Sequence, residues 1–240
     1  GVKGAVQGGT PGQTRAVVTL DISDPANPKE ISKYWLPGQR GEPDGVVKWR
    51  PGDTIHPHGP PMVIGDRMYV GYWDGGFAII DVSDPGNPEL ISHRCLYPEL
   101  SGGCTHTAMA LSSRKLLIVV DECTAYNCYE GPKNVWVFDI QDESNPELIS
   151  KFPRPKPPPT SPYKSFCQKG GRFGPHNVHE PRKGSLIDEK TIYVTWCNAG
   201  LRIFDLSNPA MPEERAYFVP PNPKKIYDPR PIYKLLDIRH

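Results

Sequence analysis

Residues 78–88 read AIIDVSDPGNP, an apolar run that ends at Asp81 and is followed by turn-forming residues. Aliphatic residues in such a run are typical of a β-strand, and a cluster of Asp, Pro, Gly and Asn after it is typical of a turn. Asp and Asn side chains accept hydrogen bonds from nearby backbone N–H groups, and proline fixes φ. We therefore expect a strand that ends in a capped turn, with the aspartate in a structural role.

The same pattern occurs three more times along the chain. The other copies are 17–28 (VVTLDISDPANP), 135–146 (VWVFDIQDESNP) and 201–209 (LRIFDLSNP). Aligned on Asp21, Asp81, Asp139 and Asp205, the copies lie 60, 58 and 66 residues apart. A regular spacing of this kind indicates a repeat architecture, in which each copy belongs to one supersecondary unit.

Further strands are predicted around each copy. A short strand follows the turn at 29–33, 89–93 and 147–151. A partner strand precedes the aspartate strand at 67–73, 115–120 and 191–196. Ahead of that partner, a strand begins at a histidine, at 58–64, at 106–111 and from His179 onward. Four consecutive antiparallel strands in each repeat are typical of the blades of a β-propeller.

The motif IxDxSDPxNPxxIS resembles that of the LVIVD-repeat proteins, a propeller family of largely undetermined biochemistry. The resemblance covers nearly the whole chain. It implies an all-β fold, a β-propeller of four-stranded antiparallel blades. It does not imply an activity, because one fold carries many functions.

We expect a single propeller domain over residues 1–240. The predicted units are a partial blade (1–52), full blades at about 53–105, 106–175 and 176–219, and the start of a further blade (220–240). A closed ring needs roughly four to eight blades. The chain is therefore an incomplete part of a ring, which we favour, or partner copies complete the ring in an oligomer.

Histidines gather where the predicted blades begin. The first strand of each propeller blade lines the central channel, so equivalent residues of successive blades converge there. The alignment makes His58, His106 and His179 equivalent, and we expect them to form an arc at one end of the channel. His56 and His176 lie close to them in sequence.

Carboxylates are expected at the same end of the channel. Antiparallel strands place the end of the second strand beside the start of the first. The ends of the second strands carry Asp74, the pair Asp121-Glu122 and Asn198, and Glu180 follows His179. The loops on this face are long: 36–55, 94–103, 123–133 and 152–175. Long loops on one face of a rigid scaffold are where proteins carry functional sites.

Imidazoles with carboxylates nearby predict a site for a divalent metal ion, namely zinc, iron, copper or manganese. The candidate metal ligands are His58, His106, His179, His56 and His176. The candidate catalytic carboxylates, each as a further ligand, a partner of an imidazole N–H or a general base, are Asp74, Asp121 and Glu180. Cys104, two residues before His106, would be a soft ligand that favours copper.

The metal site predicts an enzyme that acts on a small-molecule substrate at the mouth of the channel. The metal would serve as a Lewis acid, as in a hydrolase or lyase, or as a redox centre. Two propeller groups with channel histidines, the selenium-binding/methanethiol oxidase proteins and the carotenoid oxygenases, are metal enzymes, and the chain resembles them only distantly. The alternative is a secreted or surface binding propeller without catalysis, in which the histidines serve blade packing.

Charge and cysteine content restrict the partners and the compartment. The net charge is +1 and there is no basic stripe interleaved with aromatic residues, so we do not expect a nucleic-acid partner. No run reaches the roughly eighteen apolar residues of a membrane span. Cys95/Cys104 and Cys123/Cys128 each flank a short polar loop. Two local disulfides there would indicate an extracytoplasmic protein, periplasmic or secreted, and six independent thiols are the alternative.

Overall fold

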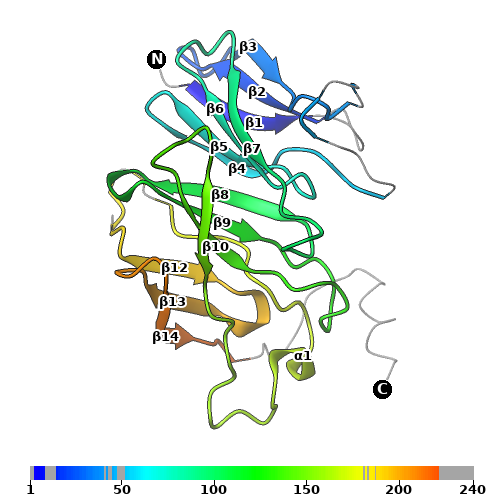
Figure 1. The fold of residues 1–240 in the computed structure, drawn as a ribbon, viewed down its shortest axis with the longest axis vertical. Helices are drawn as coiled ribbons and strands as arrows, with labels where there is room; N and C mark the ends of the chain where they lie inside the picture. The colour runs from blue at the N-terminus through cyan, green and yellow to red at the C-terminus, as the bar shows by residue number, and fades with distance from the viewer. Residues whose placement is uncertain are drawn as a thin grey trace.

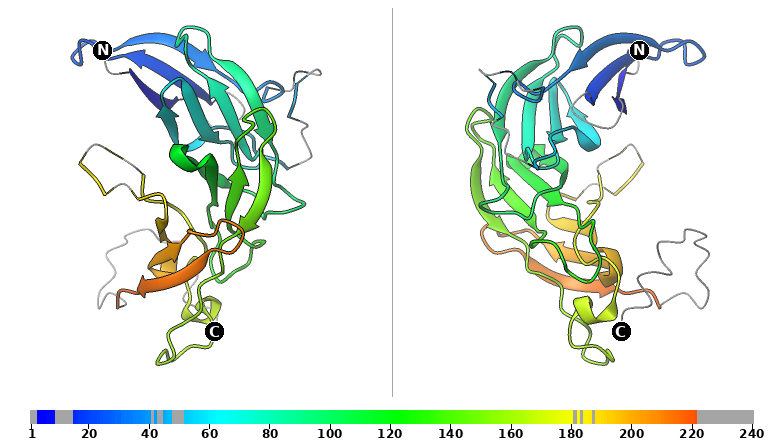
Figure 2. Two further views of the ribbon diagram at one scale, coloured as in Figure 1. Left: turned by 60° about the vertical axis from the view of Figure 1, so that its left-hand side comes forward. Right: turned by 90° about the vertical axis from the view of Figure 1, so that its right-hand side faces the viewer.

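The computed structural model describes residues 3–8 (backbone only), 15–40, 42, 45–47, 52–180, 182, 184–186 and 188–221. These residues form four antiparallel sheets that follow one another along the chain (Figure 1). Figure 2 shows the sheets along a curve, from the blue sheet at one end to the orange sheet at the other. The prediction of an all-β fold with four-stranded antiparallel sheets is confirmed. In the described residues the sheets form an open arc.

The two central sheets have the predicted four strands each, in sequential order. The second sheet contains β4 (His58–Ile64), β5 (Arg67–Gly71), β6 (Phe77–Asp81) and β7 (Glu89–Arg94). The third contains β8 (Thr105–Leu111), β9 (Leu116–Asp121), β10 (Val135–Asp139) and β11 (Glu147–Lys151). The first strands, β4 and β8, pack against each other, which places both histidine-bearing strands side by side.

The two outer sheets have three strands each. The first sheet contains β1 (Lys3–Gly8), β2 (Ala16–Asp21) and β3 (Lys29–Tyr34). The fourth contains β12 (Thr191–Thr195), β13 (Leu201–Asp205) and β14 (Glu213–Phe218). The blade boundaries stay a prediction, and most of the segment predicted to begin a further blade, 222–240, lies outside the described residues.

The strand predicted from His179 onward is not formed in the described part of the chain. The pairing with β12 ends at His179: Val178 makes a β-bridge to Val194, and the N–H groups of His176 and His179 donate to the carbonyl oxygens of Thr195 and Tyr193. The sequence that follows His179 is EPRKG. Its proline has no N–H for a strand ladder, and its charged side chains do not favour a buried channel strand. This prediction was therefore wrong.

The turns have the predicted capped form. In the second sheet, Oδ1 of Asp81 accepts hydrogen bonds from the backbone N–H and the hydroxyl of Ser83, at 2.8 and 2.6 Å. Oδ1 of Asp84 accepts another from the N–H of Gly86 at 2.9 Å. The equivalent aspartates at 21, 139 and 205 each accept from the N–H two residues later. The structural role predicted for these aspartates is confirmed.

Each pair of neighbouring sheets encloses one layer of the hydrophobic core. β9 shows how one strand serves two layers, because successive side chains point to opposite faces of a sheet. Leu117 and Val119 pack toward the second sheet, whereas Ile118 and Val120 pack toward the fourth. All four side chains are fully buried. This double burial explains why β9 reads as a continuous apolar run, LLIVVD.

A serine in the last strand of three sheets joins that sheet to the turn of the next. Ser32 donates to the carbonyl oxygen of Pro85 at 2.7 Å, and Ser92 donates to that of Glu143 at 2.6 Å. Ser150 donates to that of Pro209 at 2.6 Å. The IS pair of the repeat motif therefore connects one sheet to the next.

The described helical segments are short. Three helical turns are found, η1 (Ser112–Arg114), α1 (Phe166–Lys169) and η2 (Cys197–Ala199). None of the helices in the described residues has the length and apolar character needed to cross a membrane.

Candidate metal centre

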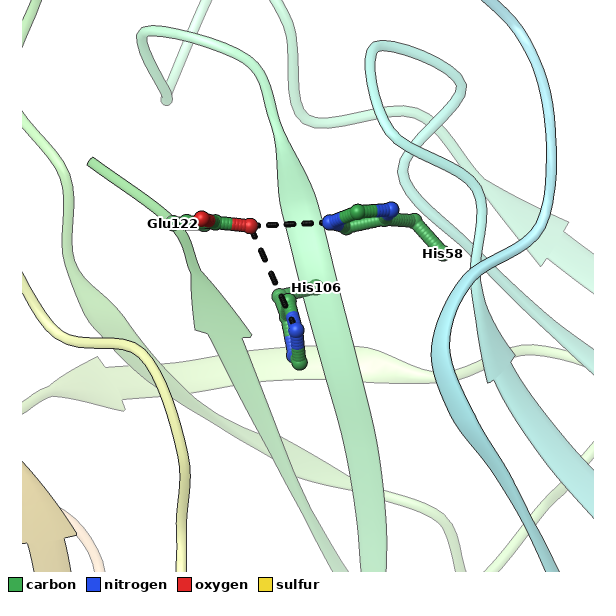
Figure 3. A group of neighbouring side chains, drawn as sticks. All are labelled: His58, His106 and Glu122. Carbon is green, nitrogen blue, oxygen red and sulfur yellow. Dashed lines mark hydrogen bonds and ion pairs between the residues drawn. The ribbon is translucent and has the colours of Figure 1, made fainter. Parts of the chain in front are cut away.

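Three side chains from two neighbouring sheets meet near the ends of their strands. His58 begins β4, His106 is the second residue of β8, and Glu122 directly follows β9. Nε2 of His58 lies 2.8 Å from Oε2 of Glu122, and Nε2 of His106 lies 4.0 Å from the same oxygen (Figure 3). One donor atom from each residue lies within 4.8 Å of the other two. We call these three residues the metal group.

Two glycines allow the strands of the metal group to approach closely. A Cβ atom at Gly59 would lie 2.1 Å from the backbone oxygen of His106, and one at Gly71 would lie 2.6 Å from it. Gly59 also has a φ of +66°, a conformation that favours glycine. The residue that follows His58 in sequence therefore sets how near this histidine comes to β8.

His176 and Arg172 contact the other oxygen of Glu122. Nε2 of His176 lies 3.4 Å from Oε1 of Glu122, and Nη1 of Arg172 lies 3.2 Å from it. The rings of His106 and His176 are adjacent, with centroids 4.5 Å apart. Glu122 is thus a largely buried carboxylate, 10% exposed at its side chain, in contact with imidazoles and one guanidinium.

His56 extends the row of imidazoles beyond His58. Its ring stacks on Trp73 with centroids 5.5 Å apart, and the ring of His58 meets the same indole edge-on at 4.3 Å. Nδ1 of His56 lies 3.0 Å from the carbonyl oxygen of Pro57, and its Nε2 lies 3.2 Å from Nη1 of Arg15. Both nitrogens of His56 therefore already have protein partners.

The charge states of the metal group suit a cation. Burial lowers the pKa of His106 to about 4, and the neighbouring His176 and His58 act in the same direction. This imidazole is therefore neutral at pH 7, with a lone pair available. Burial acts to raise the pKa of Glu122, but hydrogen bonds from His176 and His58 outweigh it and hold that pKa well below its usual range. The carboxylate is therefore ionised.

A disulfide holds the loop that carries Arg172. Cys128, in the loop after β9, is bonded to Cys167 in the long loop before β12. The two loops also share a backbone hydrogen bond, from the N–H of Asn127 to the oxygen of Gly171 at 2.9 Å. The cross-link therefore ties the segment of Arg172 to the segment that extends from Glu122.

The cysteines follow neither of the two alternatives, two local disulfides or six thiols. The structure pairs Cys128 with Cys167, 39 residues away, and Cys95, Cys104 and Cys123 are thiols. Nearness in sequence does not make two cysteines face each other, since Cys95 is exposed whereas Cys104 is buried. A disulfide needs Cβ atoms that face each other closely, and here the packing of two loops supplies that geometry.

His179 lies apart from the other predicted metal ligands. Its Nε2 lies 3.0 Å from the carbonyl oxygen of Leu186, and its ring meets that of Tyr193 edge-on at 5.9 Å. His176, three residues earlier, takes the place beside His106. The structure therefore brings together His58, His106 and His176 of the five predicted histidines, with His56 next to them.

The three predicted catalytic carboxylates have partners outside the metal group. Asp74 accepts hydrogen bonds from the backbone N–H groups of Thr54 and Cys104, at 2.9 and 3.2 Å. Asp121 is fully buried, and its Oδ2 accepts from a hydroxyl, a backbone N–H and an indole N–H. Glu180 forms an ion pair with Arg182. Their roles in catalysis stay predictions.

The sequence reasoning placed Glu122 beside Asp121 at this mouth but did not choose it as a site residue, and it missed Arg172. The residues that pair with the start of the third strand in successive sheets are Gly71, Val120 and Thr195. Two positions further on stand Trp73, Glu122 and Cys197. Glu122 is therefore equivalent to Trp73, and Asp121 is equivalent to the buried Tyr72. Alignment of the strand pairs by register would have favoured Glu122 over Asp121. Arg172 lies in a loop whose sequence does not recur in the other repeats, so no such alignment could have indicated it.

Comparison with known proteins identifies the repeat. Residues 13–35, 62–94 and 187–218 match the LVIVD repeat. These segments contain Asp21, Asp81 and Asp205, three of the four aligned aspartates. The chain thus contains three LVIVD repeats. No curated protein matches the chain.

Proposed function

We propose that this chain, which contains three LVIVD repeats, is a metal-dependent enzyme that acts on a small molecule at the metal group. The observation that carries the proposal is the meeting of two imidazoles and one carboxylate from three separate strand ends, with donor atoms within 4.8 Å of one another. Two imidazole nitrogens and a carboxylate oxygen suit zinc, iron, copper or manganese.

The hydrogen bonds around the metal group support this assignment. Nδ1 of His106 lies 2.7 Å from the hydroxyl of Thr107. When this nitrogen donates to the hydroxyl, the lone pair of Nε2 faces Glu122, as in metal sites where a second partner fixes the imidazole. The buried Nδ1 of His58 has no hydrogen-bond partner among the described residues, so folding does not use the full bonding capacity of that ring.

Each residue of the site has a separate part in the proposed chemistry. His58, His106 and Glu122 would hold the ion, and His176 and Arg172 orient the carboxylate through its other oxygen. A bound divalent ion would polarise a substrate oxygen, lower the pKa of a water molecule, or serve as a redox centre. His58 is 24% exposed and His176 is 33% exposed, which leaves the group open to a small molecule on one side.

We also propose that the protein acts outside the cytoplasm. The Cys128–Cys167 disulfide supports a periplasmic or secreted location, because structural disulfides persist in oxidising compartments and are rare in the cytosol. This proposal rests on the one disulfide.

Metal analysis of matched variants tests the proposed function. The protein would be purified without chelator or nickel resin, and its metal content measured by inductively coupled plasma mass spectrometry. We expect close to one equivalent of zinc, iron, copper or manganese in the parent. His58→Ala and Glu122→Gln should weaken binding by at least about 10–100-fold, since loss of a supporting partner alone costs that much.

His176→Ala and His179→Ala are the matched pair. His176→Ala should weaken metal binding, whereas His179→Ala should retain it, because His179 lies outside the group. Circular dichroism would verify that each variant is folded. A parent protein that binds none of the four metals, even after reconstitution, would contradict the enzyme and leave a binding propeller as the better account.

A further inference from the structure

We infer that the substrate of this site is a small carboxylate, which Arg172 binds through the edge of its guanidinium that faces away from Glu122. The inference rests on the proposed function and names the class of molecule that the metal group would act on. It is based on the N–H groups of Arg172 that make no hydrogen bond within the described residues and on the net charge around the metal group.

The guanidinium of Arg172 uses one of its two terminal nitrogens within the protein. Nη1 donates to Oε1 of Glu122 and to the carbonyl oxygen of Cys123, each at 3.2 Å. Nε and Nη2 make no hydrogen bond in the described residues, and the side chain is 39% exposed. The N–H groups of Nε and Nη2 point in parallel along one edge, and two parallel donors match the two oxygens of a carboxylate.

The charges around the metal group favour an anion. In the described residues at this mouth, Glu122 is the carboxylate in contact with Arg172, His58 and His176. A divalent cation held there would leave a net positive charge, to which Arg172 adds. Asp74 lies outside this group, where two backbone N–H groups donate to its carboxylate. A site with net positive charge raises the local concentration of anions.

The backbone of Arg172 is fixed on both sides before any ligand binds. Its carbonyl oxygen accepts a hydrogen bond from the N–H of Asn198 at 3.1 Å, and it forms a β-bridge with Tyr126. The Cys128–Cys167 disulfide closes the same loop. Such preorganisation reduces the entropy lost on binding, so the free edge of the guanidinium would already be held in place when a carboxylate binds.

Carboxylate titration of the Co(II)-loaded protein tests the inference. Co(II) supplies visible absorption bands that report ligands at the ion. These bands verify that the ion site is occupied. Acetate and benzoate should then bind with saturation in isothermal titration calorimetry, whereas acetamide and benzamide should not. Arg172→Gln, examined at saturating Co(II), should bind both carboxylates about tenfold or more weakly. Arg172→Lys, which keeps the charge but loses the parallel edge, should bind them with intermediate affinity.

The control variant is Arg182→Gln. Arg182 is another arginine paired with a glutamate, Glu180, but it is 73% exposed and outside the metal group. It should bind carboxylates as the parent does. Equal binding of amides and carboxylates, or parent-like carboxylate affinity in Arg172→Gln, would overturn the inference and leave the metal site intact. Absence of Co(II) bands in the parent would instead overturn the metal site, and the inference with it.

Discussion

At the scale of single residues, the chemistry of the site depends on which face of a strand each side chain occupies. Asp121 and Glu122 are neighbours, yet Asp121 is fully buried among three donors whereas Glu122 reaches the histidines. Side chains alternate along a strand, so adjacent carboxylates reach different surroundings. Asp121 therefore stabilises the loops, and Glu122 can hold a cation.

His93 lies away from the site and allows a test of how burial changes the pKa of a histidine. Its Nε2 lies 2.5 Å from the carbonyl oxygen of Gly75. Burial lowers the pKa of His93, while the bond to Gly75 acts against that effect. The unfolded chain therefore takes up a proton as the pH falls through about 6.5, before the folded protein does. The free energy of unfolding should decrease over that range.

His93→Gln retains an N–H donor for Gly75 but cannot be protonated. We expect the parent to lose more stability than this variant between pH 7 and pH 5, as measured by urea denaturation at each pH. Above pH 7.5 the difference between the two proteins should be constant. Parallel curves throughout would show that His93 does not resist protonation in the folded state.

At the scale of the elements, the join between sheets depends on one hydroxyl in each last strand. Ser32, Ser92 and Ser150 pair with equivalent residues of the preceding strand. In β14 that position holds Ala216, opposite Ile203, and an alanine cannot make the bond. Among the described sheets, the three that are followed by another sheet therefore have the serine, and the fourth has an alanine in its place.

Ser92→Ala removes one such join. The carbonyl oxygen of Glu143 would lose a partner 2.6 Å away in a buried interface. We expect a decrease of about 1 kcal/mol in the free energy of unfolding, measured by urea denaturation. Ser112→Ala is the control, because Ser112 is exposed and its hydroxyl makes no hydrogen bond within the described residues. An equal effect of the two substitutions would contradict the role assigned to Ser92.

At the scale of the whole molecule, stability and the site are connected through the arc of sheets and its loops. The core layers lie between consecutive sheets, and the metal group lies between the second and third. The loop that adds Arg172 and His176 comes from the approach to the fourth sheet and is joined to the third by Cys128–Cys167. Loss of this cross-link should therefore lower both the stability of the fold and the affinity of the site for a metal ion.

The double substitution Cys128→Ser and Cys167→Ser tests that connection. A cross-link between residues 39 positions apart is expected to contribute about 4 kcal/mol by restricting the unfolded chain. We expect a loss of this order in urea denaturation and a weaker affinity for Co(II). Cys95→Ser, which changes an exposed thiol, should leave the free energy of unfolding and the affinity for Co(II) equal to those of the parent within error. A double variant indistinguishable from Cys95→Ser would contradict the proposed connection.

Patterns in the amino-acid sequence suffice to predict the repeat, the turns and most strands. Each of these follows from residues close in the chain: an apolar run at β-strand period and an aspartate that caps the next turn. The same local reasoning placed His58 and His106 at the starts of neighbouring first strands, where the structure has them. It also placed a carboxylate at the end of β9, although it chose Asp121 where Glu122 reaches the histidines.

Which side chains meet at the site depends on how distant parts of the chain pack together. His176 contacts His106 in place of His179 because of how this segment pairs with β12. The N–H of His176 bonds to Thr195 at the end of that strand, whereas the N–H of His179 bonds to Tyr193, further along it. Arg172 and the Cys128–Cys167 disulfide depend on two loops packing together, for which the repeat carries no signal. Local patterns set elements and turns, whereas contacts between distant loops depend on how the whole chain packs.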